Sequence, residues 1–215
     1  MRRDCPQGAH KAPVIGLLGA VASGKSTVAR LLAARGASVV DADRIGHEVL
    51  GRPAIKGHLR EAFGDGIFAP DGEVERGKLA EMVFGHADLL ERLNAIVHPA
   101  VFTLAAERVQ RERCCPGVPL VVLDAALLLE KGLDSCCDLL VFVECGEQNR
   151  RRRARLERGW TAEHLASRDS AQISADRKRR RADTVIRNDG TQQELEKAVA
   201  KLVDTMAQKF PIPSE

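Results

Sequence analysis

Residues 19–26 read GAVASGKS and fit the pattern G-x-x-x-x-G-K-[S/T]. The apolar residues 14–18 before them are typical of a buried strand. Between Lys25 and Ala34, apolar residues at helical spacing predict a helix, and Gly36 is placed to end it. A loop between a strand and a helix cradles anions, because backbone N–H groups and the helix dipole favour negative charge there. The sequence therefore predicts a site for a nucleoside triphosphate.

Each polar residue of this loop has an expected role. Lys25 would reach the β- and γ-phosphates, and the Ser26 hydroxyl would bind Mg²⁺. A chance match in a glycine-containing turn is the alternative, and the strand and helix on either side argue against it. The predicted ATP-binding positions in the loop are Ala22, Ser23, Gly24, Lys25, Ser26 and Thr27.

The composition describes a globular protein. The chain has 215 residues, of which 44% are hydrophobic and 29% charged, and its formal net charge is +3. This length fits one domain with insertions. No apolar run approaches the ~20 residues of a transmembrane helix, and no apolar stretch before Val14 suggests a signal peptide. We expect residues 1–12 to form a disordered extension ahead of the first strand.

The cysteines favour a reducing compartment. There are six, and two pairs are sequence neighbours, at 114–115 and 136–137. This spacing fits neither a disulfide framework nor a C-x₂-C zinc site. Together with the phosphate loop it predicts a cytoplasmic protein with reduced cysteines.

Two carboxylates follow the second predicted strand, at residues 37–40. Asp41 and Asp43 come at the carboxyl end of this strand, where open α/β sheets bind their ligands. One could bind Mg²⁺ and the other could accept a proton from an acceptor hydroxyl. The alternative is that one of them caps a helix starting near Arg44, as Asp often does.

The rest of the chain alternates between strands and helices. Strands are predicted at 120–124, 139–143 and 184–186, and the terminal Asp124 resembles a Walker B carboxylate. A capping box at residues 191–194 opens the last helix. This alternation predicts a three-layer α/β fold with a parallel five-stranded sheet.

A mostly helical block separates the second and third strands. Helices are expected at residues 53–63, 79–84 and 89–97. A boundary is expected at His98-Pro99, with Pro99 in the first turn of a further helix. The block is too long for a simple crossover, so we interpret about 53–117 as an acceptor-binding insertion.

Arginines concentrate between the fourth and fifth strands. They occupy much of 150–158 and 177–181, and Thr161 between them is placed to cap a helix. Most could form a solvated helix face, and an RNA-binding patch is a second interpretation. A lid over ATP, with one or two arginines stabilising the transferring phosphoryl group, is the third. The position after the fourth strand favours the lid, at about 147–181.

Taken together, these motifs resemble the dephospho-CoA kinase family of P-loop kinases. The resemblance spans Val14 to about Lys209. Its motifs, in order, are the loop at 19–26, Asp41-Ala42-Asp43, Asp71-Gly72-x-x-x-Arg76, Leu93-Asn94-x-x-x-His98-Pro99, Leu127-Leu128-x-Glu130, the region of Arg153, Gln172, Lys178, Ala182-Asp183-x-Val185-Ile186 and Asn188-x-Gly190.

The resemblance implies ATP-dependent phosphorylation of the ribose 3′-hydroxyl of dephospho-CoA, with Mg²⁺, in the final step of coenzyme A biosynthesis. It implies a kinase domain over 13–215, with its core at 13–52, 118–146 and 182–209. By matching position, the catalytic residues are Lys25, Asp43 and Arg153, and Asn188 joins the ATP site. The acceptor side is Asp43, Arg76, His98, Leu127 and Glu130, and the metal ligands are Ser26 and Asp41.

Three features depart from the family pattern. Ala22 replaces a usual glycine, and Ala126 stands where proline is frequent. The run of arginines leaves the register open, so Arg153 could exchange roles with Arg151, Arg155 or Arg158 (all candidates for the lid arginine).

The sequence also allows alternative functions. Another small P-loop kinase acting on a nucleotide or a sugar is the nearest alternative. A GTPase is disfavoured because the chain lacks an Asn-Lys-x-Asp element, and a nucleic-acid-binding protein would use the arginine clusters. We expect ATP and dephospho-CoA as partners, no nucleic acid or membrane, and a monomer or weak homo-oligomer.

Overall fold

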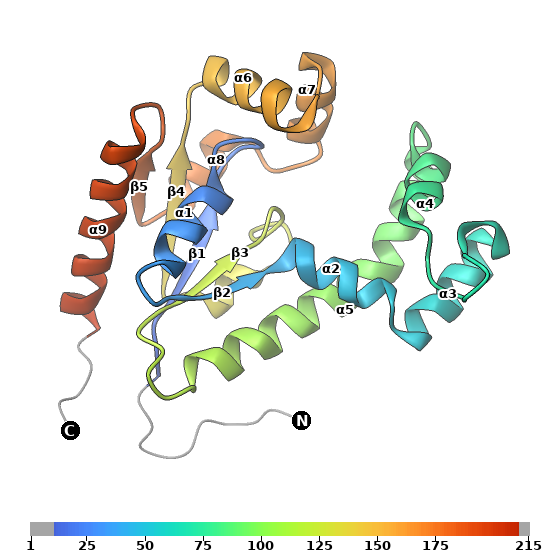
Figure 1. Cartoon of the computed structure of the whole chain (residues 1–215), viewed down its shortest axis with the longest axis horizontal. Helices are drawn as coiled ribbons and strands as arrows, with labels where there is room; N and C mark the ends of the chain where they lie inside the picture. Colours follow the sequence, from blue (N-terminus) through green and yellow to red (C-terminus); the bar gives the residue numbers. More distant parts are fainter. Residues whose placement is uncertain (1–10, 211–215) are drawn as a thin grey trace. The chain divides into compact units, whose positions relative to one another are not determined.

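A parallel sheet forms the centre of the computed structural model, which describes residues 11–210. Its strand order is β2-β3-β1-β4-β5, and every neighbouring pair is parallel (Figure 1). The predicted parallel five-stranded sheet is confirmed. Apart from residues 11 and 12, the predicted N-terminal extension lies outside the described residues. The strands are β1 (Val14–Leu18), β2 (Ser38–Asp41), β3 (Val121–Asp124), β4 (Leu139–Glu144) and β5 (Thr184–Arg187).

Helices connect these strands, and their capping residues follow the sequence signals. Thr161 accepts a hydrogen bond from the His164 N–H, and Thr191 and Glu194 form the expected capping box. The α-helices are α1 (Lys25–Ala33), α2 (Ala42–Leu50), α3 (Pro53–Phe63), α4 (Arg76–Val83), α5 (Ala87–Arg113), α6 (Glu147–Arg158), α7 (Ala162–Ser170), α8 (Ala175–Arg181) and α9 (Gln192–Lys209), and the 3₁₀ turns are η1 (Asp65–Ile67) and η2 (Leu133–Cys136).

The chain divides into two compact units. The first contains the residues up to Asp41 and those from Ala106 onward, and the second is Ala42–Ala105. The second unit therefore begins before residue 53, where the sequence places the start of the insertion. The division of roles between core, insertion and lid stays a prediction.

The core of the first unit lies between the sheet and the helices α1 and α9. These two helices pack against each other beside the sheet (Figure 1). Alternate strand residues point into this layer, as the period of a strand requires. Its buried residues include Ile15 and Leu17 of β1, Val122 of β3, Val141 and Val143 of β4, Val28 and Leu32 of α1, and Leu195, Val199 and Leu202 of α9.

The opposite face of β1 is crowded at Gly16. A Cβ there would lie 2.7 Å from Cys137 Sγ and 2.9 Å from Leu140 Cδ2. Burial raises the pKa of the Cys137 thiol to about 12, so it remains a neutral, packed side chain. Glycine at position 16 therefore lets the β3–β4 connection approach the sheet closely.

The sequence predicts reduced cysteines, and the structure agrees at most described positions. Free thiols occur at Cys115, Cys136, Cys137 and Cys145. Cys114 is disulfide-bonded, so the expectation fails at that position.

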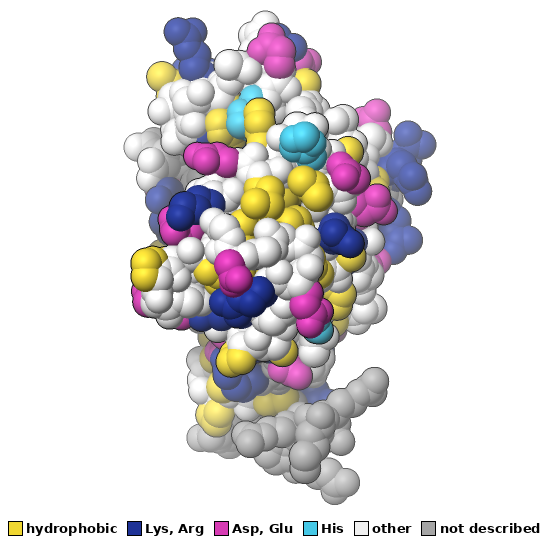
Figure 2. All heavy atoms as spheres, turned by 90° about the vertical axis from the view of Figure 1, so that its right-hand side faces the viewer, with side chains coloured by type: hydrophobic (Ala, Val, Ile, Leu, Met, Phe, Trp, Pro, Cys, Tyr) yellow, Lys and Arg dark blue, Asp and Glu magenta, His cyan; other side chains and the backbone are white. Residues whose placement is uncertain are grey.

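The second unit has a small core of its own. Ile45 and Val49 of α2, Leu59 of α3 and Leu79 of α4 are buried, as is Ile67 of η1. The face of the molecule in Figure 2 intermixes hydrophobic side chains with charges of both signs and histidines. Phe84 and Leu90 of this unit are exposed hydrophobic residues.

The expected helix boundary at His98-Pro99 is wrong. A single helix, α5, runs from Ala87 to Arg113 with Pro99 inside it. Inside a helix, proline removes one hydrogen bond and its ring clashes with the carbonyl of residue i−4, at a cost of about 3 kcal/mol. Buried Val101 and Val109 follow within the same helix, so packing on the C-terminal side offsets the lost bond.

No helix within residues 11–210 is both long and apolar enough to cross a membrane.

Candidate functional site

Two carboxylates and the phosphate loop meet at one edge of the sheet. Asp124 pairs in register with Leu17 of β1 on one side and with Asp41 of β2 on the other. The strands are parallel, so their carboxyl ends lie at the same edge, where α/β sheets bind ligands. The loop 19–24 leaves β1 at this edge, and α1 begins directly after it.

The loop needs unusual backbone conformations. Gly24 precedes α1 with φ 93°, and Ala22 is the sole non-glycine residue with positive φ within residues 11–210, at 60°. A Cβ at Gly24 would lie 2.1 Å from Asn188 Nδ2, so glycine is required for space as well as for φ. Glycine would adopt this conformation at position 22 without strain, whereas an L-residue such as Ala22 carries an energetic penalty there.

Lys25 and Ser26 begin α1 next to the edge of the sheet. Lys25 Nζ donates to the carbonyl oxygens of Gly19, at 3.2 Å, and Ala20, at 3.4 Å. The Ser26 hydroxyl donates to Asp124 Oδ2 at 3.0 Å. The loop therefore presents an ammonium group, while a hydroxyl and a carboxylate lie side by side at the end of β3.

Arg153 and Asn188 both donate hydrogen bonds to the backbone of the loop at Ser23. Arg153 donates to the Ser23 carbonyl at 3.1 Å and to the Asn188 carbonyl at 2.8 Å. Asn188, which is buried, donates from Nδ2 to the same Ser23 carbonyl at 2.8 Å. These bonds bring together two predicted site residues from α6 and from the end of β5. A catalytic role for Arg153 stays a prediction, since its guanidinium here binds the protein's own backbone.

Asp189 joins the loops after β4 and β5. Its Oδ1 accepts from the Gly146 N–H at 2.7 Å and from Asn149 Nδ2 at 3.1 Å. The Asn149 and Gly146 bonds hold the pKa of Asp189 below its usual value. Burial raises the pKa of the neighbouring Cys145 thiol to about 11, despite the Arg153 charge. This carboxylate fixes the start of α6 and hence the helix that carries Arg153.

Glu130 belongs to a buried polar cluster. Its Oε1 accepts from the Ile173 N–H at 2.8 Å and lies 3.3 Å from Lys178 Nζ. Lys178 is 2% exposed, and it also donates to Gln172 Oε1 at 2.7 Å and to the Ala126 carbonyl at 3.2 Å. Three acceptors thus surround the three-donor ammonium, which makes its burial tolerable. The cluster ties the segment after β3 to the segment before β5, and an acceptor-binding role for Glu130 stays a prediction.

The other predicted acceptor residues divide between the two units. Leu127 lies in the first, shortly after β3. Asp43 is exposed in the first turn of α2, Arg76 is the first residue of α4, and His98 lies within α5 against Phe102. Because α2 begins at Ala42, Asp43 is inside the helix and does not cap it. Acceptor binding by these residues stays a prediction.

Sequence reasoning leaves three residues out of the site. The sequence marks Asp124 as a Walker B-like carboxylate but does not place it among the metal ligands. Arg150 is one arginine in a run of similar residues, and Asp169 carries no signal in the sequence. Both Arg150 and Asp169 bind Val21 of the loop, across 129 and 148 residues of sequence.

A parallel sheet of this order, with a glycine loop, its lysine and a serine–aspartate pair at the same edge, defines a P-loop kinase fold. Comparison with known proteins narrows this class. A family model described as dephospho-CoA kinase matches residues 13–194. The chain belongs to the dephospho-CoA kinase family.

Individual relatives agree with this family over nearly their full lengths. A dephospho-CoA kinase of Thermobifida fusca is 39% identical over 198 residues, which cover 91% of this chain and 97% of that protein. Among solved structures, TT1252 from Thermus thermophilus has a TM-score of 0.73 at 32% identity, covering 91% and 98% of the two chains. A dephospho-CoA kinase from Campylobacter jejuni has a TM-score of 0.67 at 18% identity, covering 92% and 98%, and shows the same fold.

Proposed function

We propose that this protein transfers the γ-phosphoryl group of ATP to the ribose 3′-hydroxyl of dephospho-CoA, which yields coenzyme A and ADP. Family membership supports the two substrates. The observation that carries the proposal is the phosphate loop at the carboxyl edge of the sheet, with Ser26 bonded to Asp124. This arrangement suits a bound triphosphate because the N-terminus of α1 and Lys25 supply positive charge.

The reaction exchanges one phosphorus–oxygen bond for another. The acceptor hydroxyl oxygen bonds to the γ-phosphorus, while the bond from that phosphorus to the β,γ-bridging oxygen breaks and ADP leaves with the electron pair. The hydroxyl proton passes to the Asp43 carboxylate. Asp43 is two residues after Asp41, the last residue of β2.

The oxygen atoms at this edge fit Mg²⁺. Magnesium takes oxygen ligands and is held by one or two carboxylates together with substrate phosphates and water. Ser26 and Asp124 supply a hydroxyl and a carboxylate, and Asp41 lies beside Asp124 in the sheet register. Residues 11–210 contain no cluster of three or more His, Cys, Asp or Glu side chains that could hold a metal. Held by Ser26, Asp124 and Asp41, Mg²⁺ would supply positive charge against the substrate phosphates.

The magnesium assignment predicts a change in metal dependence. Asp124→Asn keeps an acceptor for the Ser26 hydroxyl but loses the charge, so the Mg²⁺ concentration for half-maximal activity should rise by about tenfold or more. Asp41→Asn should act in the same direction and be partly rescued by added metal. Glu144→Gln is the matched control, because Glu144 ends β4 but pairs with Arg179 and Arg187. An unchanged Mg²⁺ dependence in Asp124→Asn would contradict the assignment.

The arginine-rich segment fits a lid better than a polyanion surface. Arg150 and Arg151 pair with carboxylates, and Arg153 binds the loop. Arg158 and Arg168 lie over the Trp160 ring, at 4.7 and 4.2 Å. These five arginines thus have partners within the protein, which supports an intramolecular role for them.

A panel of acceptors tests the function. Purified protein with Mg²⁺ and ATP should release ADP rapidly with dephospho-CoA and only at background rate with nucleoside monophosphates or gluconate. The product should carry the new phosphate at the ribose 3′ position, as determined by ³¹P NMR or by mass spectrometry after digestion. Preferential turnover of a nucleotide or sugar would instead identify another P-loop kinase.

A further inference from the structure

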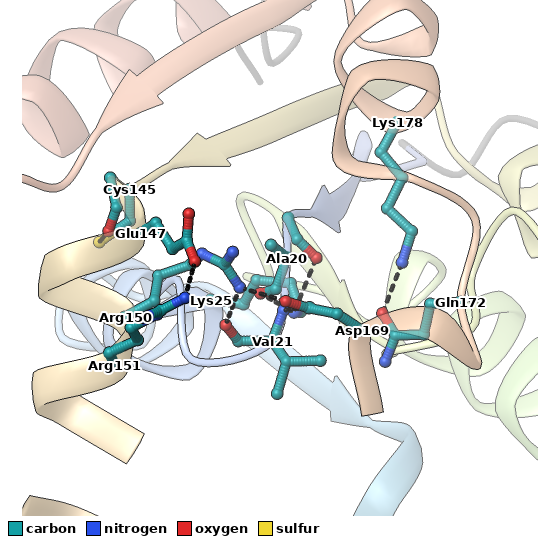
Figure 3. A network of polar contacts seen from close by, with 12 residues as sticks. Ala20, Val21, Lys25, Cys145, Glu147, Arg150, Arg151, Asp169, Gln172 and Lys178 are labelled. Carbon is teal, nitrogen blue, oxygen red and sulfur yellow. Dashed lines mark hydrogen bonds and ion pairs between the residues drawn. The ribbon is translucent and has the colours of Figure 1, made fainter. Parts of the chain in front are cut away.

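Val21, at the turn of the phosphate loop, is held on both of its backbone groups. Its N–H donates to Asp169 Oδ1 at 3.0 Å, and its carbonyl accepts from an Arg150 guanidinium nitrogen, Nη1, at 3.1 Å. The same nitrogen donates to Asp169 Oδ2 at 2.6 Å. Figure 3 shows the three residues in one closed network, with Lys25 and Ala20 of the loop beside it. An ion pair between Arg150 and Asp169 thus binds both backbone polar groups of Val21.

The two charged residues come from different helices. Arg150 lies in α6, and Asp169 lies near the end of α7. The Arg150 side chain is 14% exposed and that of Asp169 is 32% exposed. Partly buried ion pairs are screened less than surface pairs, and hydrogen bonds to charged groups are stronger than neutral ones. The network therefore links α6, α7 and the loop tightly.

Apolar packing accompanies the polar contacts. Val21, Ala154 of α6 and Leu165 of α7 form a small buried cluster, against which Ala22 and Trp160 pack. Val21 is thus fixed through its side chain as well as through its backbone. The loop and the two helices behave as one packed assembly.

The next residue, Ala22, explains why such support matters. Its φ of 60° is a left-handed conformation that costs energy for any residue except glycine. A strained backbone persists only where surrounding contacts over-determine it. Since Val21 and Ala22 are consecutive, contacts that hold Val21 also hold the strained peptide in place.

We propose that Arg150 and Asp169 are positioning residues that keep the phosphate loop in its phosphate-binding conformation. The inference rests on the proposed function only in taking ATP as the ligand of the loop. Both side chains act through Val21. If the loop adopts the competent conformation for a fraction of the time, the apparent dissociation constant for ATP rises by the inverse of that fraction. Loss of either charged residue lowers the fraction.

The experiment compares ATP affinity and steady-state kinetics in Arg150→Ala, Asp169→Ala and the double variant. Each single change should raise the Kd for Mg²⁺-ATP by about fivefold to thirtyfold, and the double variant should be little worse, because the residues act as one unit. The KM for dephospho-CoA should stay within about twofold, since coupling between distant sites is small. Asp169→Asn keeps an acceptor for the Val21 N–H, so it should lose less affinity than Asp169→Ala.

Glu147 and Arg151 provide the matched control. They form an Arg–carboxylate pair on the same helix, α6 (Figure 3), and both side chains are exposed. Neither contacts the loop in the hydrogen bonds that hold Val21. Glu147→Ala breaks this exposed pair and should therefore leave the Kd for ATP unchanged. Where an alanine variant does not fold, Arg150→Lys and Asp169→Asn allow the same comparison.

Three results would overturn the inference. The first is an unchanged Kd for ATP with a lower Tm, which would make the network a stabilising contact alone. The second is a fall in kcat at unchanged ATP affinity in Arg150→Ala, which would place Arg150 on the transferring phosphoryl group. The third is additive losses in the double variant. ATP affinity is measured without an acceptor, so failure of the dephospho-CoA assay alone would count against the proposed function and not against this inference.

Discussion

Replacement of Lys25 by alanine is expected to reduce phosphoryl transfer by at least about 10²–10³-fold, the scale for loss of one group that stabilises charge in a transition state. Lys25 Nζ lies within the loop, 3.2 Å from the Gly19 carbonyl oxygen. A bound triphosphate would offer this ammonium group a charge-assisted hydrogen bond, in which both members of the pair are charged. The measurement is kcat and kcat/KM for ATP in the dephospho-CoA assay.

The fold should survive this change. Lys25 is partly exposed and contributes two hydrogen bonds of ordinary or long length to the loop. Circular dichroism and Tm should therefore stay close to those of the unmodified protein. Lys197→Ala, on the exposed side of α9, is the matched control and should keep full activity. Near-normal turnover in a folded Lys25→Ala variant would refute the assignment of this loop as the phosphate site.

Asp43→Asn is expected to lower kcat by at least about 10²-fold while ATP still binds, since general bases contribute about 10²–10⁴-fold. Asparagine keeps the shape and can orient the acceptor hydroxyl, but it cannot take the proton. Phosphoryl transfer has a loose transition state in most analyses, so part of the loss reflects orientation. The measurement is kcat together with the separately determined Kd for ATP.

Stability separates this role from a structural one. Asp43 lies in the first turn of α2, where a carboxylate gains about 0.3–1 kcal/mol from the helix dipole. Asp43→Asn should therefore cost little in Tm. Glu61→Gln, an exposed carboxylate-to-amide change in α3, should leave kcat unaltered. Substantial activity combined with a clearly lower Tm in Asp43→Asn would mean that the carboxylate serves the helix and that the base is another residue.

Local patterns predict most elements because their causes are local. The strands at 14–18 and 139–143, the helix at 53–63 and the capping box at 191–194 depend on periodicity and on neighbours within a few residues. The error at Pro99 has the same origin. A proline weakens a helix locally, but burial of residues on its C-terminal side, which the sequence does not display, carries α5 through it.

The site residues also divide into those that local sequence patterns predict and those that depend on long-range packing. Gly24, Lys25 and Ser26 are adjacent in sequence, so their motif alone is enough to predict a phosphate loop. Asp124 could have been included among the metal ligands, since it ends a strand as Asp41 does. Its bond to Ser26 spans 98 residues and depends on how the strands pair. Pairing order is set by long-range packing of the sheet.

The sequence by itself determined the strand, loop and helix of the proposed phosphate site, because a few consecutive residues fix that geometry through backbone conformation and hydrogen bonding. Only the tertiary structure decided which groups each arginine contacts. Arg150 and Arg153 are three residues apart in a run of identical side chains, yet one binds Val21 and Asp169 and the other binds Ser23 and Asn188. The partners are brought in from α7 and the end of β5, and a charged side chain acquires a role from the groups that surround it in the folded chain.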